Sequence, residues 1–86
     1  MTWRDARSTY PCRWLLIEAL EARSAEGRRV VEDLAVVEAC ADAADALRQY
    51  LALHRAAPGR ELYVAHTDRS QLEIEEQEWL GPRRVA

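Results

Sequence analysis

The sequence of 86 residues contains no lysine, no phenylalanine and only one methionine. Every one of its 12 cationic side chains is therefore an arginine, and 15 acidic residues oppose them to give a formal net charge of -3. Lysine is missing from the whole chain rather than from one face, which is typical of a GC-rich genome rather than of arginines selected for bidentate contacts. With a pI of ≈ 5.3, the chain lacks the excess of basic charge typical of nucleic-acid-binding domains, so we do not expect nucleic acid as a partner.

Long apolar runs are also missing. No run exceeds four residues, as in Trp14-Leu15-Leu16-Ile17, which is far short of the about 20 residues that a membrane-spanning helix needs. No apolar segment directly follows the basic N-terminal residues, so we expect no secretory signal, no membrane contact and a cytoplasmic location. Because 49% of the residues are hydrophobic, we expect one small packed domain over residues 1–86, with a basic lead segment (1–12) and a basic tail (81–86) that need not be ordered.

Glycine and cysteine are too sparse for the common ligand-binding motifs. The three glycines lie far apart, whereas a phosphate-binding loop needs closely spaced ones. Cys12 and Cys40 form no C-x-x-C pair and lie close in sequence to neither histidine, so we expect buried, reduced thiols, no metal and no cofactor.

The first half of the chain is compatible with two kinds of secondary structure. Residues 13–23 alternate as a strand does but also contain good helix formers. Residues 29–40 are rich in valine, which favours a strand, although Val30, Leu34 and Val37 also recur at helical spacing. A helix cap at Asp42 requires the chain to change direction near Cys40, so we favour a strand for residues 29–40.

The clearest element is a helix over residues 42–57. Asp42 is a good N-cap and Pro58-Gly59 ends the pattern. Four residues recur at spacings of three and four and predict one buried stripe, namely Leu47, Tyr50, Leu51 and His54.

Two further strands are expected over residues 61–67 and 71–80, because both segments alternate. The predicted fold is α+β, with a small, mainly antiparallel sheet in the order β-β-α-β-β and one helix packed on one face. The alternative is a helical hairpin followed by a C-terminal β-ribbon. One helix cannot cover both faces of a sheet, so we expect an apolar sheet face that binds a partner.

No arrangement of nucleophile and base indicates catalysis. The best candidate for ligand binding is a polar cluster at the end of the third strand, formed by His66, Asp68 and Arg69, in which an imidazole could be oriented next to an anion-binding guanidinium.

Charge is segregated along the chain, with arginines near both ends and four glutamates within residues 71–79. We therefore predict a non-enzymatic interaction module that forms a homodimer or docks to a larger protein through its sheet. The apolar anchors would be Trp14, Tyr63, Trp79 and Leu80, and the polar rim Glu73, Glu75, Arg83 and Arg84. The alternative function is a small-ligand-binding protein or minor enzyme with a pocket around His66, Asp68 and Arg69.

Overall fold

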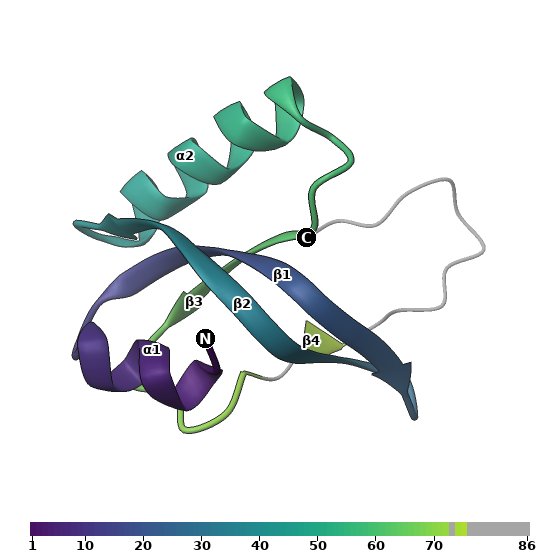
Figure 1. Ribbon diagram of the computed structural model, residues 1–86. Coiled ribbons are helices and arrows are strands. Elements are labelled where there is room, and N and C mark those ends of the chain that lie inside the picture. Colours follow the sequence, from purple (N-terminus) through teal and green to yellow (C-terminus); the bar gives the residue numbers. More distant parts are fainter. Residues whose placement is uncertain (73, 76–86) are drawn as a thin grey trace.

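The computed structural model describes residues 1–72 and 74–75 and has an α+β fold (Figure 1). Its elements are, in chain order, α1 (Trp3–Thr9), β1 (Trp14–Ala25), β2 (Arg28–Cys40), α2 (Ala43–Ala56), β3 (Leu62–His66) and β4 (Ile74–Glu75). The sheet has the order β3-β1-β2-β4, and its described pairings are antiparallel. The order along the chain differs from the expected β-β-α-β-β because a helix precedes the first strand.

The long hairpin β1–β2 is the largest element of the fold. Its strands pair from Trp14 opposite Cys40 to Ala25 opposite Arg28, so the expectation of strands is confirmed and the helical hairpin is wrong. The two residues of the turn, Glu26 and Gly27, both have positive φ (52 and 76). The twist of a hairpin favours positive φ at both positions of a two-residue turn.

β3 pairs with the first half of β1, from Trp14 opposite His66 to Glu18 opposite Leu62. It confirms the strand expected over residues 61–67. Of the strand expected over residues 71–80, the structure describes residues 71, 72, 74 and 75. Residues 71 and 72 are not part of a strand, whereas Ile74 and Glu75 form β4 and pair with Arg29 and Arg28 of β2. Residues 73 and 76–80 lie outside the described residues.

The N-terminal helix α1 corrects the expectation of a single helix. Thr2 caps it, since its hydroxyl accepts the Asp5 N–H (3.2 Å) while the Asp5 carboxylate accepts the Thr2 N–H (3.2 Å). Such a reciprocal pair satisfies two of the free N–H groups at a helix start. Trp3 and Ala6, one turn apart, are buried, so part of the expected lead segment is a packed helix.

Helix α2 begins after the expected cap: the Asp42 carboxylate accepts the Asp45 N–H at 2.8 Å. Its orientation differs from the predicted stripe. Ala46, Tyr50 and Leu53 pack against the core, whereas Leu47 and Leu51 are 52% and 50% exposed. The small Ala46 allows the helix to approach the sheet closely, and this turns the neighbouring leucines outward.

The two helices lie on opposite faces of the sheet (Figure 1). On the α1 side the core contains Trp3, Ala6, Leu15, Ile17, Leu34 and Ala65. On the α2 side it contains Leu16, Cys40, Ala46 and Leu62. Alternate residues of β1 thus enter different cores, and the expected bare apolar sheet face is not found in the described structure. No helix among the described residues is long and apolar enough to cross a membrane.

Candidate functional site

A hollow of ≈ 350 Å³ lies beside β3 and brings together several residues that the sequence analysis singles out. It is lined by Trp14, Tyr63, Val64, Ala65, His66, Arg69, Leu72 and Ile74. Two predicted anchors, Trp14 and Tyr63, therefore share one hollow with two of the three predicted ligand-binding residues. The third, Asp68, lies on the adjoining turn.

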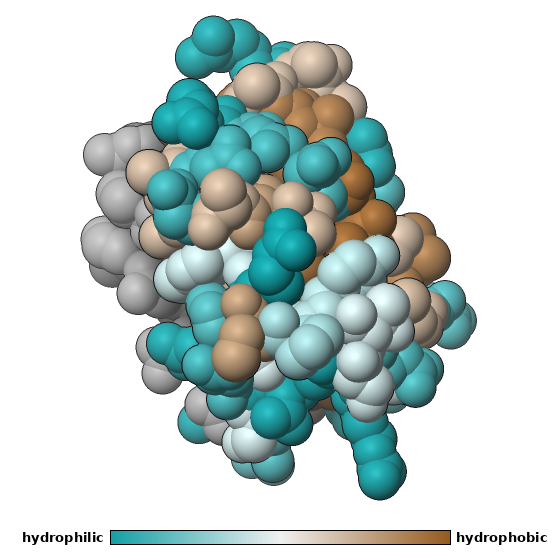
Figure 2. All heavy atoms as spheres, turned by 90° about the vertical axis from the view of Figure 1, so that its left-hand side faces the viewer, coloured by the Kyte–Doolittle hydropathy of each residue, from teal (hydrophilic) through white to brown (hydrophobic). Residues whose placement is uncertain are grey.

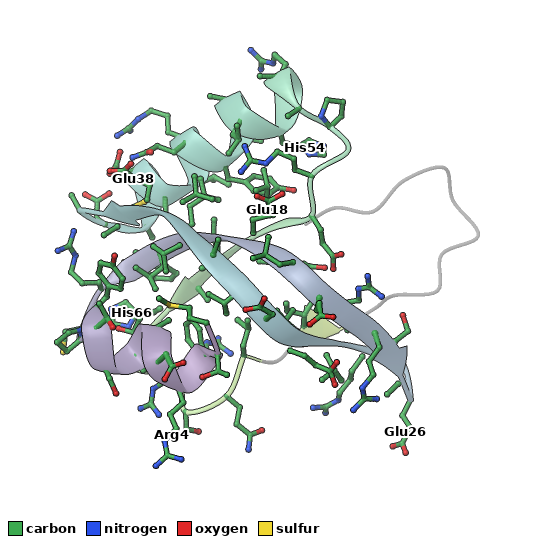
Figure 3. The ribbon with its side chains drawn as sticks, viewed as in Figure 1. Arg4, Glu18, Glu26, Glu38, His54 and His66 are labelled. Carbon is green, nitrogen blue, oxygen red and sulfur yellow. The ribbon has the colours of Figure 1, made fainter. Side chains whose placement is uncertain are left out.

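His66 is oriented by the start of that turn. Its Nδ1 accepts the backbone N–H of Asp68 at 3.0 Å, and its ring and that of Trp14 form a T-shaped pair with centroids 5.1 Å apart. Because Nδ1 is an acceptor, the neutral ring carries its proton on Nε2. His66 lies apart from the other histidine, His54 of α2 (Figure 3), and its side chain is only 25% exposed.

The Asp68 carboxylate lies between His66 and Cys12. Its Oδ2 is 3.7 Å from the His66 Nδ1, and its Oδ1 accepts the Cys12 thiol at 3.5 Å. This hydrogen bond and the carboxylate charge raise the pKa of Cys12, which keeps the exposed thiol protonated and weakly nucleophilic. The expectation of two buried thiols thus holds for Cys40 and is wrong for Cys12.

The turn that carries these groups is fixed by Thr67, which sequence reasoning missed. Its buried hydroxyl donates to the Tyr10 carbonyl (2.7 Å) and accepts the Arg13 N–H (2.9 Å). The Thr67 carbonyl accepts the Arg7 guanidinium (2.9 Å), and the Trp3 indole donates to the Arg69 carbonyl (3.0 Å). Nothing in the sequence distinguishes Thr67 from an ordinary turn residue, because all of its partners come from more than 50 positions away.

The opposite end of β3 is held by ion pairs. Glu61 accepts two hydrogen bonds from the Arg29 guanidinium (2.7 and 2.9 Å) and one from the Tyr63 hydroxyl (2.6 Å). The Arg29 hydrogen bonds lower the pKa of Glu61, while burial and the neighbouring carboxylate raise the pKa of Tyr63 above its usual range. Next to them, the Arg60 guanidinium donates to Glu18 at 2.6 Å and lowers the pKa of that carboxyl.

A second hollow of ≈ 390 Å³ lies between the start of α1, the start of β2 and residues 70–72 and 74. Arg4, Arg28 and Arg29 contribute to its lining together with apolar side chains such as Trp3 and Val31. Arg29 is already engaged by Glu61, and Arg28 has partners of its own. The charge available to a ligand in this hollow is therefore smaller than three arginines would provide.

The outer face of α2 carries an apolar surface formed by leucines that the sequence predicts to be buried. Leu47 and Leu51 lie one turn apart and expose about half of their side chains. Beside them, His54 stacks on Tyr50 with ring centroids 5.6 Å apart and an interplanar angle of 3°. Figure 2 shows a band of hydrophobic atoms in the upper part of the molecule, on the side that carries α2.

Of the remaining predicted interface residues, the structure describes only the backbone of Glu75. Glu75 pairs through its backbone with Arg28, at the opposite edge of the sheet from β3. The others lie outside the described residues, namely Glu73, Trp79, Leu80, Arg83 and Arg84.

Within residues 1–72 and 74–75, no group of three or more histidine, cysteine or acidic side chains could hold a metal ion. Comparison of the chain with protein-family models, with curated proteins and with solved structures gives no match.

Proposed function

We propose that the protein is a non-enzymatic interaction module, an accessory or regulatory subunit that docks to a larger protein. The observation that carries this proposal is the exposed pair Leu47 and Leu51 on α2. Two leucines four positions apart match the spacing with which amphipathic helices enter apolar grooves of their partners. The sequence predicts docking through the sheet, whereas the exposed leucines favour docking through the helix.

Charge around the leucines narrows the kind of partner. Arg48 and Arg55 are exposed neighbours on the same helix, and the Arg48 side chain is 71% exposed even though it contacts Asp45. A groove with an apolar floor and an acidic rim would complement this face. We include in the proposal a cytoplasmic location, which the sequence analysis expects.

Co-purification from the native cells, with mass spectrometry and matched variants, tests the proposal. The double variant Leu47→Asp/Leu51→Asp should lose the partner, because two charges would enter an apolar groove. The control Ala52→Asp adds a charge to an exposed position on another side of the same helix and should keep it. Partners that bind both variants equally well would refute docking through the leucines.

A second candidate function is binding of a small anionic ligand in the hollow beside β3. It is favoured by the meeting of His66 and Arg69 on one hollow of ≈ 350 Å³, where a neutral imidazole N–H and a guanidinium would both donate. A rise in the thermal midpoint with one member of a metabolite panel, absent in His66→Ala, would support it. No shift with any member would exclude this function for the compounds tested.

A further inference from the structure

The outer edge of β3 presents backbone hydrogen-bonding groups to its surroundings. The Thr67 N–H donates to the Arg13 carbonyl, and the Ala19 N–H donates to the Glu61 carbonyl, both at 2.9 Å. Odd-numbered residues therefore direct their backbone groups toward β1, and the alternation of a strand directs those of Leu62, Val64 and His66 outward. In the described part of the chain no strand pairs with this edge, although the His66 carbonyl also accepts the Arg69 N–H (3.1 Å).

The two edges of the sheet differ in how they are covered. Along β2, the Leu34 N–H donates to the Met1 carbonyl (2.8 Å), the Met1 amino group donates to the Leu34 carbonyl (2.9 Å), and β4 pairs with the start of the strand. β3 instead consists of Leu-Tyr-Val-Ala-His, without the proline, bulge or charged side chain that commonly protects an edge strand. The space beside it is the open hollow lined by Trp14 and Tyr63.

We propose that this edge binds the same edge of a second copy of the chain, antiparallel and centred on Val64. Among the registers that pair the outward-facing residues, this one alone pairs all five residues of β3, with Leu62 opposite His66 of the partner subunit. Val64 then lies opposite Val64 of the partner subunit, and the two sheets become one continuous sheet.

Charge complementarity at both ends supports a second copy as the occupant. In this register Arg60 lies opposite Asp68 of the partner subunit, and symmetry repeats the pair at the other end. Both side chains can reach outward, since Arg60 is 38% exposed while bound to Glu18 and Asp68 is 70% exposed. No residue between these two ends within β3 carries a formal charge when His66 is neutral, so no like charges meet across the interface.

This inference deepens the proposed function by naming one partner. It rests on the proposed function only because both give the protein a role in binding other proteins. It uses β3 rather than the exposed leucines of α2. Either surface can therefore fail its test without the other.

Sedimentation velocity of the full chain over a dilution series tests the dimer. The wild type should show a concentration-dependent monomer–dimer equilibrium. Val64→Pro removes an N–H that points away from β1, so the sheet within the subunit keeps its hydrogen bonds, while the dimer dissociation constant should rise about tenfold or more. Val64→Thr, which keeps the shape and the N–H, should stay within about threefold of the wild type.

A charge exchange tests the register and does not depend on the folding of the proline variant. Asp68→Arg places like charges opposite each other and should weaken the dimer about tenfold, and Arg60→Asp/Asp68→Arg should restore it within about threefold. Circular dichroism and the thermal midpoint establish that each variant is folded.

A wild type that stays monomeric at about 1 mM, a dimer unaffected by Val64→Pro, or no rescue by the double variant would each overturn the proposal. Loss of the dimer in Leu47→Asp/Leu51→Asp but not in Val64→Pro would assign it to α2 and overturn the β3 edge, while leaving the proposed function intact.

Discussion

At the scale of single residues, Glu61 joins two strands that are distant in sequence. Its carboxylate accepts hydrogen bonds from Arg29 of β2 and from Tyr63 of β3. Its side chain is 30% exposed, so water weakens the pair without removing its benefit. The arrangement fixes the start of β3 in the same way that Thr67 fixes its end, and both ends matter for any partner that pairs with this edge.

The lowered pKa of Glu61 predicts a specific sensitivity to acid. Its stabilisation is complete above the ordinary value of 4.5 and is lost as the pH falls toward the lower pKa of the folded state. Glu61→Gln should cost about 1 kcal/mol of unfolding free energy at neutral pH and should flatten the fall in stability below about pH 4.5. Urea unfolding at several pH values measures both effects.

The matched control is Glu32→Gln, which removes a carboxylate from the exposed ion pair between Glu32 and Arg23. Exposed pairs contribute little, so the change should stay below about 0.5 kcal/mol. Equal effects of the two substitutions would contradict the role assigned to Glu61.

At the scale of elements, helix α2 decides which apolar side chains remain available for binding. Its length and its cap follow from the sequence, but its orientation follows from how closely Ala46 approaches the sheet. As a result, Tyr50 and Leu53 complete the core while Leu47 and Leu51 face outward. A docking surface and a core contact thus lie on adjacent sides of one helix.

The same substitution on two sides of α2 tests this orientation. Leu47→Ser removes an exposed side chain and should change the unfolding free energy by less than about 0.5 kcal/mol. Leu53→Ser removes a side chain that packs against Leu16 and its neighbours and should cost about 1–2 kcal/mol. Thermal or chemical unfolding measures the difference. A larger loss of unfolding free energy for Leu47→Ser than for Leu53→Ser would show that the helix buries the stripe predicted from the periodicity.

At the scale of the whole molecule, the sheet separates two thin cores, one under each helix. The sequence predicts those features that depend on local chemistry, such as the Asp42 cap, the alternation of β3 and the strand character of residues 29–40. It fails where a distant contact decides the outcome. Helix α1 has only seven residues and gains its stability from packing Trp3 and Ala6, because isolated helices of this length are unstable.

The candidate site was predictable to a similar degree. His66 and Arg69 follow from their place at the end of a strand and in the turn after it, and Trp14 and Tyr63 follow from their size. Their common hollow depends on the pairing of β1 with β3, for which the spacing of residues along the chain contains no signal. The roles of Thr67 and Arg7 could not be predicted for the same reason, since the hydrogen bond between them spans 60 positions.

Site-specific photo-crosslinking in the native cells tests whether the protein acts by docking the outer face of α2 onto a larger protein. A photoreactive residue is placed either at Leu51, within the exposed pair, or at Ala52, an exposed neighbour on another side of the helix. We expect one discrete crosslinked species, heavier than a dimer of this chain, from position 51 and none from position 52. No such species from position 51, or equal yields from both positions, would contradict this expectation.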